Sequence, residues 1–290
     1  RPFISSRGFP GQGDRSMSIL SAFSLPPIAR GFVILLIAGA VFPAVGIFVF
    51  RLNLINIRFM LMHGGLLGGA VALAAGVNPL LLTLAVNMVL IVVVARLGSG
   101  IARNYGYVST FLMVLTMGLA FLIIYKAGVP AKDAMTVLWG NILALTPVDA
   151  WMTVGVAAVT AAFVIVYYRK LLAVLFHRDV AFASGIDEKS LHSVILFLIG
   201  LTVSLCMRLI GALLLDAIVL LPAAVGMLFA KSARGMFLSA AVTGLAATVF
   251  GFFGALSFDV PVSSGIIIAA SVIWAAAFLR KRILDRRMGK

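Results

Sequence analysis

The sequence has little charge, and most of that charge is positive. Charged residues make up 11% of the 290 positions, with 23 Lys and Arg residues against nine Asp and Glu residues. Hydrophobic residues make up 63% of the chain, which leaves too little polar surface for a soluble domain of this length. The shortage of charge therefore indicates a protein that spans a membrane.

Cysteine and the common catalytic motifs are also scarce. Cys206 is the single cysteine, so an internal disulfide and a cysteine-only metal cage are excluded. The sequence has no Gly-x-x-x-x-Gly-Lys-Ser/Thr for binding ATP phosphates, no His-Glu-x-x-His and no Gly-x-Ser-x-Gly. We therefore expect no catalytic residues, no permanently bound cofactor and no ATP site in this chain.

The apolar runs are long and continuous, which excludes the alternating strands of a membrane barrel. A helix of about 20 apolar residues crosses a bilayer core of ~30 Å. The sequence therefore predicts an all-α, polytopic transmembrane helical bundle with nine spans, or eight if one run does not cross. The runs lie at 30–50, 57–76, 79–96, 107–127, 149–168, 190–207, 209–230, 236–256 and 262–279.

The polar ends of the chain and one long loop define its organisation. Residues 1–27 are predicted to form an N-terminal tail, in which Met17 is an alternative initiator. Residues 28–280 are predicted to form one transmembrane domain, whose longest inside loop is 169–190. Residues 281–290 form a basic C-terminal tail.

The distribution of Lys and Arg predicts the orientation in the membrane, because cytoplasmic loops carry an excess of both. Placing the C-terminus in the cytoplasm puts 16 of the 23 Lys and Arg residues inside, among them Arg51, Arg58 and Arg234. This rule accounts for the net charge of +14, so nucleic acid is excluded as a partner. We expect a multi-pass protein of the cytoplasmic (inner) membrane, embedded in the lipid bilayer.

His63 lies in the predicted span 57–76, away from its ends, and Met60 and Met62 lie beside it. Imidazole binds Zn²⁺ and Mn²⁺, and the two thioethers add soft sulfur. The competing interpretation is a buried histidine that bonds to a backbone carbonyl. Gly64 and Gly68 follow at a spacing that permits close helix packing.

Asp216 is the one ionisable residue among the 22 that follow Arg208 up to the next basic residue. A charge at the centre of a membrane helix costs about 2.5–3.5 kcal/mol on insertion scales, so we expect a partner. Arg208 is ~12 Å away along the helix, too far for a direct pair. His63, Asn87, an ion or a proton are the candidates; the alternative is a neutral carboxyl in a packed interface. Pro222 predicts a kink in the same helix.

The loop 169–190 has apolar residues at helical spacing, and Gly185 is suited to end a helix there. The pattern indicates a short amphipathic helix. Two interpretations remain open: a plain interfacial helix, or a helix that docks into a groove of a partner protein.

Six stretches, in this order, resemble the integral membrane permeases of zinc, manganese and iron ABC importers, and the similarity covers most of residues 28–280. They are Arg30-Gly-Phe to Gly46-Ile-Phe-Val-Phe-Arg51, His63 with Gly68, Leu138-Trp-Gly-Asn-Ile-Leu143 with Pro147, Tyr168-Arg-Lys to Phe176-His-Arg-Asp-Val-Ala-Phe-Ala-Ser-Gly185, Gly211-Ala-Leu-Leu with Leu221-Pro-Ala-Ala, and Phe258-Asp-Val-Pro-Val-Ser-Ser-Gly265.

The resemblance implies the permease subunit of an ATP-binding cassette importer that moves a divalent metal cation as cargo. It implies a homodimer, separate cytoplasmic ATP-binding subunits that carry the ATP, and an extracytoplasmic substrate-binding protein. It also makes 169–190 the coupling loop, with Phe176, Ala181, Ser184 and Gly185 as its coupling residues.

One position departs from the family pattern. The family has an aspartate four residues before its histidine, and this chain has Phe59 there, while Asp216 stands on another helix. Either a carboxylate has moved to another helix beside the same path, with His63 and Asp216 as tentative metal ligands, or the cargo is chelated or is not a metal. A proton-coupled secondary transporter that uses Asp216 is a further alternative.

Overall fold

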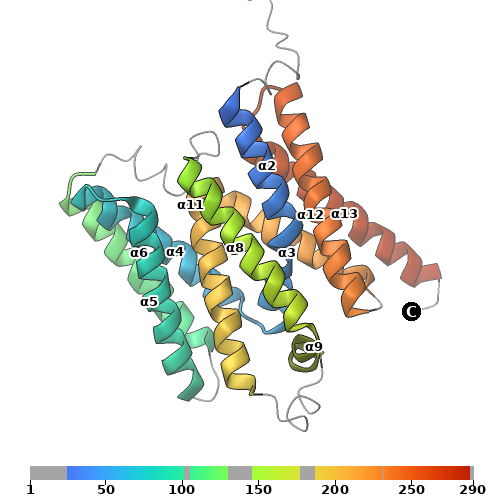
Figure 1. Ribbon diagram of the computed structural model, residues 1–290, viewed down its shortest axis with the longest axis horizontal. Helices are drawn as coiled ribbons and strands as arrows, with labels where there is room; N and C mark the ends of the chain where they lie inside the picture. The colour runs from blue at the N-terminus through green and yellow to red at the C-terminus, as the bar shows by residue number, and fades with distance from the viewer. Residues whose placement is uncertain (1–24, 101–104, 130–145, 177–186, 231, 288–290) are drawn as a thin grey trace, which may run out of the picture.

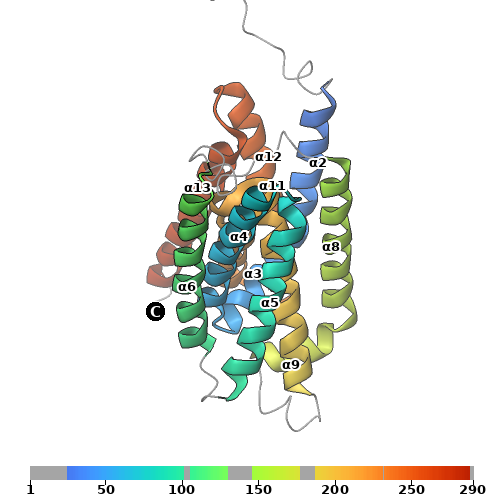
Figure 2. The ribbon, with the colours of Figure 1, turned by 90° about the vertical axis from the view of Figure 1, so that its left-hand side faces the viewer.

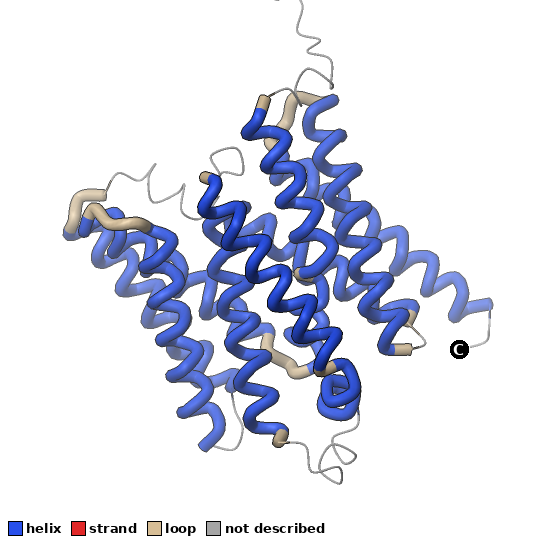
Figure 3. Tube along the Cα trace, viewed as in Figure 1, coloured by secondary structure: helices blue, strands red, loops and turns tan. Residues whose placement is uncertain are grey.

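The computed structural model describes residues 25–100, 105–129, 146–176, 187–230 and 232–287. Every regular element in these ranges is an α-helix, which confirms the predicted all-α fold (Figure 3). The helices are α2 (Pro26–Val41), α3 (Pro43–Arg51), α4 (Ile55–Ala75), α5 (Pro79–Gly100), α6 (Tyr105–Lys126), α8 (Pro147–Val166), α9 (Tyr168–Phe176), α11 (Glu188–Phe229), α12 (Ala233–Ser257) and α13 (Val262–Arg287).

Within the described ranges, eight helical segments are long and apolar enough to cross a membrane. α2 and α3 count as one of them, Pro26–Arg51, although Pro43 begins a new helix after a turn at Phe42. The predicted span 209–230 falls in the second of the two helices that meet at a kink in α11, at Gly211. Its residues continue α11, and only Leu214–Phe229 forms a shorter apolar segment there. Eight segments therefore have the length of a span, as in the lower of the two predicted numbers, and the shorter Leu214–Phe229 segment returns the chain to the end of the bundle where Arg234 lies over Tyr168.

The helices form two groups that meet at α11. α4, α5 and α6 pack on one another in one group, and α2, α3, α12 and α13 form the other (Figures 1 and 2). α11 packs against members of both groups. Its first span, Ser190–Met207, is 67% buried inside the protein, whereas the span in α13 is 11% buried. α11 is therefore the centre of the bundle, and α13 presents most of its apolar surface to the surrounding membrane.

Small residues bring the helices into backbone contact. A Cβ added to Gly39 in α2 would lie 2.8 Å from the carbonyl oxygen of Gly244 in α12. A Cβ added to Gly68 in α4 would lie 2.6 Å from the Cα atom of Thr83 in α5. The close packing that we predicted at the glycines of 64–68 is thus confirmed. Such contacts are a main source of helix association in lipid, where burial of apolar surface gives no advantage.

Local capping explains where several helices begin and end. Thr146 and Asp149 form a reciprocal capping box at the start of α8, and Pro147 occupies its first turn. The Ser232 side chain accepts a hydrogen bond from the amide of Gly235 at the start of α12. Gly76, with φ of 66°, closes α4 in a left-handed conformation that suits glycine.

Basic residues gather at one end of the bundle, around α9. Four of them lie over aromatic rings there: Arg51 over Phe176, Lys170 over Tyr167, Arg234 over Tyr168 and Arg280 over Phe229. This placement agrees with the prediction that these loops share one side of the membrane. Most of the predicted N-terminal tail, residues 130–145 and the loop residues Ala181, Ser184 and Gly185 lie outside the described residues.

Candidate functional site

A break in α11 positions the candidate site. Gly211 has φ of 81° and ψ of 164°, a conformation that is open to glycine and strained for any other residue. The helix therefore changes direction there, and the segment that follows carries Asp216. We had predicted the bend at Pro222, but the backbone remains helical through that residue.

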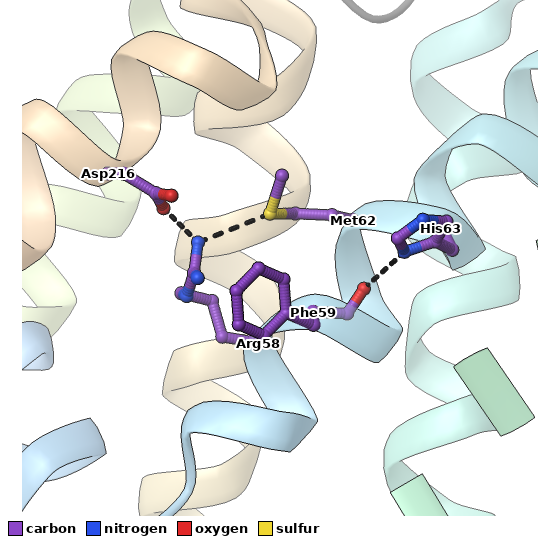
Figure 4. A network of polar contacts seen from close by, with 5 residues as sticks. All are labelled: Arg58, Phe59, Met62, His63 and Asp216. Atoms are coloured by element: carbon purple, nitrogen blue, oxygen red, sulfur yellow. Dashed lines mark hydrogen bonds and ion pairs between the residues drawn. The ribbon is translucent and has the colours of Figure 1, made fainter. Parts of the chain in front are cut away.

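Asp216 forms an ion pair with Arg58, near the start of α4 (Figure 4). The Arg58 guanidinium also lies 3.2 Å from the sulfur of Met62 and 4.0 Å from the ring centroid of Phe59. Arg58 is 2% exposed and the Asp216 side chain is 39% exposed. The pair thus joins the second part of α11 to α4, with the cation enclosed and one side of the carboxylate accessible.

This pairing answers the electrostatic question that the sequence raised. Neither charge is favourable alone inside a membrane, and pairing with a hydrogen bond offsets part of that cost for both. The count of basic residues had placed Arg58 with the inside loops, whereas the structure buries its side chain between helices. The sequence did indicate a buried position for Arg58, because this residue falls inside the predicted span 57–76.

His63 points away from this pair (Figure 4). Its Nδ1 atom lies 2.8 Å from the carbonyl oxygen of Phe59, one turn earlier on the same helix. Five residues separate Arg58 and His63, and at 3.6 residues per turn their side chains differ by about 140° around α4. The structure therefore does not bring His63 and Asp216 together. Its contact matches the interpretation of a histidine satisfied by a backbone carbonyl.

Phe59 occupies the position where the resembling family has its aspartate. Its ring packs on the Arg58 guanidinium, and its carbonyl oxygen faces the imidazole of His63. An aromatic face attracts a cation, so this phenylalanine stabilises the buried arginine where an aspartate would compete with Asp216 for it. In the part of the chain that is described, no three His, Cys, Asp or Glu side chains are grouped so as to hold a metal ion.

The other predicted polar and sulfur candidates have structural contacts. Met60 is fully buried in the main apolar core. The Asn87 side-chain amide donates a 2.8 Å hydrogen bond to Ser204 on α11, and its Oδ1 atom accepts none. Asn87 therefore joins α5 to the first part of α11 and does not partner Asp216.

Close packing at Gly46 fixes the second part of α11 against α3. Any Cβ at this position would collide with the backbone carbonyl of Val219 and with the side chain of Ala223. Val219 follows Asp216 by one helical turn, so the contact at Gly46 helps to set where the carboxylate lies.

The described part of the 169–190 loop contains a short helix with one apolar face. α9 buries Leu171, Val174 and Leu175 and so has one apolar face, while the rest of the predicted helix, up to Gly185, lies outside the described residues. Its last residue, Phe176, lies 4.2 Å below the Arg51 guanidinium and lines a hollow of about 250 Å³. This hollow is also lined by Ala233 and Met236 at the start of α12, so Phe176 lies beside the ends of two spans.

Comparisons with known proteins identify the family. Residues 24–281 match the model of the ABC 3 transport family. The chain is similar to the manganese import system permease protein ScaB of Streptococcus gordonii, with 25% identity over 90% of this chain and 95% of that protein. The zinc uptake membrane protein ZnuB of Buchnera aphidicola is 22% identical over 81% of this chain and 91% of its own length. A chain of PsaBC from Streptococcus pneumoniae has the same fold, with a TM-score of 0.78 and 22% identity over 92% of this chain and 98% of that chain. Because the family model matches 258 of the 290 residues, 24–281, this chain belongs to the ABC 3 transport family.

Proposed function

We propose that this protein is the permease subunit of an ATP-binding cassette importer and that its cargo is a divalent metal cation: zinc, manganese or iron. The observation that carries the proposal is the family match across residues 24–281, which includes seven of the eight described spans in full and most of the eighth. Relatives that match most of the chain bear names that specify manganese or zinc uptake.

The working assembly in this proposal has three kinds of component. Two copies of this chain form the membrane unit, separate cytoplasmic subunits bind and hydrolyse ATP, and an extracytoplasmic protein delivers the metal. The protein lies in the cytoplasmic (inner) membrane, and its C-terminus and the basic end around α9 face the cytoplasm. This orientation rests on the excess of Lys and Arg at that end.

The coupling step uses the segment 169–190. Closure of the ATP-binding subunits moves α9, and Phe176 passes the movement to Arg51 at the end of α3. Two-state movement of packed helix groups is a common way to open a path alternately to each side. Ala181, Ser184 and Gly185 supply the docking contacts. Ala181→Glu should uncouple ATP hydrolysis from transport while the protein still inserts.

Asp216 remains the carboxylate that we assign to the metal path, and Arg58 sets the condition for its use. The accessible side of Asp216 faces a passing cation only after the ion pair with Arg58 loosens. His63 lines the path from the other side of α4 in this proposal. The two residues therefore act at successive positions, since the structure keeps them apart.

Uptake of radioactive metal tests the proposal. The chain would be expressed together with ATP-binding and substrate-binding proteins from the same genome, in a host that lacks its own manganese and zinc importers. We expect accumulation of Mn²⁺, Zn²⁺ or Fe²⁺ that disappears when the ATP-binding subunit loses its phosphate-binding lysine. Accumulation that is unaffected by that change would contradict an ATP-driven importer.

A chelated metal is the second candidate cargo, and Arg58 is the observation that favours it. The family position for a ligand carboxylate holds Phe59, and a cation lies next to it. A path with a fixed arginine suits an anionic or neutral complex better than a bare cation. In the same assay, uptake of metal only as a chelate, with free metal excluded, would select this candidate.

A further inference from the structure

A long apolar groove runs along the outside of the bundle between α8 and α12. Both helices pack on α2 and α3, but they do not pack closely on each other (Figure 1). The groove has a volume of about 650 Å³. Its lining is almost entirely apolar: Ala40, Val41, Ala44, Ala161, Val164, Ile165, Phe237, Leu238 and Ala241, with Tyr168 and Arg234.

The sequence creates this space with alanines. Ala40 and Ala44 lie one turn apart at the junction of α2 and α3, and Ala161 and Ala241 face the groove from the two walls. Larger side chains at these positions would fill the groove with protein atoms. The open volume is therefore a property of this sequence and not a general consequence of packing α8 beside α12.

One end of the groove carries a positive charge without a carboxylate. The Arg234 guanidinium lies 5.6 Å from the ring centroid of Tyr168. No described acidic side chain pairs with Arg234, and the side chain is exposed. Arg51 and Lys170 belong to the same basic end and also lie over aromatic rings. This end can therefore accept an anion.

The walls of the groove belong to membrane-spanning segments, which restricts the occupant. The segments Pro26–Arg51, Pro147–Val166 and Ala233–Ser257 are all candidate spans. A groove on their outer surface opens to lipid, and its basic end lies where the spans meet the aqueous phase. Basic pockets between transmembrane helices on the cytoplasmic side are a known form of binding site for anionic lipid head groups.

We propose that this groove is a binding site for one anionic phospholipid, with an acyl chain along the alanine-lined floor and the phosphate at Arg234. The groove volume lies in the range that bound small molecules fill in proteins. The site is independent of the cargo; only its assignment to the cytoplasmic leaflet rests on the proposed orientation. Because α9 and α12 flank the head group, bound lipid links the membrane to the segment that leads into the coupling loop.

Native mass spectrometry of the detergent-purified full chain, titrated with phosphatidylglycerol and with phosphatidylcholine, tests the site. We expect one phosphatidylglycerol to bind more tightly than the others and than any phosphatidylcholine. Arg234→Gln should weaken that first binding about fivefold, the value for one cation at a membrane surface. Arg280→Gln is the matched control, because Arg280 is also exposed and lies over the ring of Phe229 outside the groove.

A second pair of variants tests the apolar part. Ala161→Phe fills the groove and should weaken the first phosphatidylglycerol about tenfold by displacing several methylene groups. Ala162→Phe, on the exposed neighbouring position, should leave it unchanged. Glycerol 3-phosphate, which has the phosphate but no chain, should not compete.

The outcomes separate the possibilities. If Arg234→Gln weakened binding of the first phosphatidylglycerol and Ala161→Phe did not, the lipid would be held by a surface charge alone. That result would overturn the groove as the binding site. Competition by glycerol 3-phosphate would assign the basic end to a free phosphate compound. A change from dimer to monomer in Ala161→Phe would make the groove an interface between copies. Equal binding by all variants would also overturn the proposal.

Discussion

Arg58 and His63 lie five residues apart on α4, and their polar contacts are of different kinds. The guanidinium of Arg58 pairs with a carboxylate from another helix, whereas the imidazole of His63 contacts a carbonyl oxygen of its own helix. A permanent charge inside a membrane needs a counter-charge, and few positions supply one. The Nδ1 atom of His63 needs only one backbone oxygen, and its own helix supplies it. The first residue therefore constrains the arrangement of helices, and the second leaves it unconstrained.

The largest effect is expected from breaking the charge pair. Asp216→Asn leaves Arg58 enclosed without a counter-charge, and breaking a buried pair costs about 3–5 kcal/mol. Because the Asp216 side chain is 39% exposed, we expect a smaller loss of about 2 kcal/mol, with reduced transport. Thermal unfolding in detergent and metal uptake at equal abundance measure both.

Replacing both partners sharpens the same test. Arg58→Met with Asp216→Asn removes the stranded charge, so stability should return while metal uptake stays low. Recovered uptake in the double variant would show that Asp216 acts only by holding Arg58. Full uptake by the single Asp216→Asn variant would contradict any role of the negative charge in cation passage.

The second-largest effect is expected at the close contact between α3 and α11, which helps to set where Asp216 lies. Gly46→Ala forces a Cβ against the backbone of α11 at Val219, and overpacking of this kind costs about 1–3 kcal/mol. We expect a lower unfolding temperature and weaker transport, because the segment carrying Asp216 must shift. Gly155→Ala in α8 is the control: a Cβ there meets no atom within 4 Å, so stability should be equal or slightly higher.

The third effect is expected from placing an aspartate at position 59, where the resembling family has one and this chain has Phe59. Phe59→Asp, added to Asp216→Asn, places a carboxylate one turn from His63 and beside Arg58. We expect partial recovery of metal uptake, to roughly a tenth of the normal rate or more, since ligand geometry is restored only in part. Recovery of thermal stability without any recovery of uptake would mean that the new carboxylate only replaces the counter-charge of Arg58.

The smallest structural effect is expected from His63→Ala. The histidine contact lies within one helix, so we expect a change in unfolding free energy below about 1 kcal/mol. Uptake of metal should nevertheless fall at equal membrane abundance if His63 lines the path. Uptake equal to that of the unchanged protein would leave His63 as a packing residue.

The spans were predictable because their signal is local. Twenty apolar residues in sequence specify a membrane helix whatever the neighbours are. The exception was the region around Gly211, where two predicted runs form one interrupted helix. A continuous apolar sequence gives no information about where the chain leaves and re-enters the helical conformation, so the number of spans was uncertain by one.

The candidate site was predictable only in part. Asp216 was recognisable from the sequence as an unusual charge, but its partner lies 158 positions away in the chain and was not identified. No periodicity or spacing links positions that are so far apart. His63 and Asp216 were considered together because both are polar and both lie in spans. They do not meet, because the side chain of His63 points away from the face of α4 that Asp216 of α11 contacts.

The sequence by itself determined that this protein is a helical membrane protein, where most spans lie, and to which family it is similar, because these depend on composition and on short local patterns. Tertiary structure alone decided that Arg58 neutralises Asp216, that Phe59 covers the arginine and that small residues leave a groove between α8 and α12. The physical reason is that pair distances and open volumes depend on how helices cross, which is set by many small contacts at once.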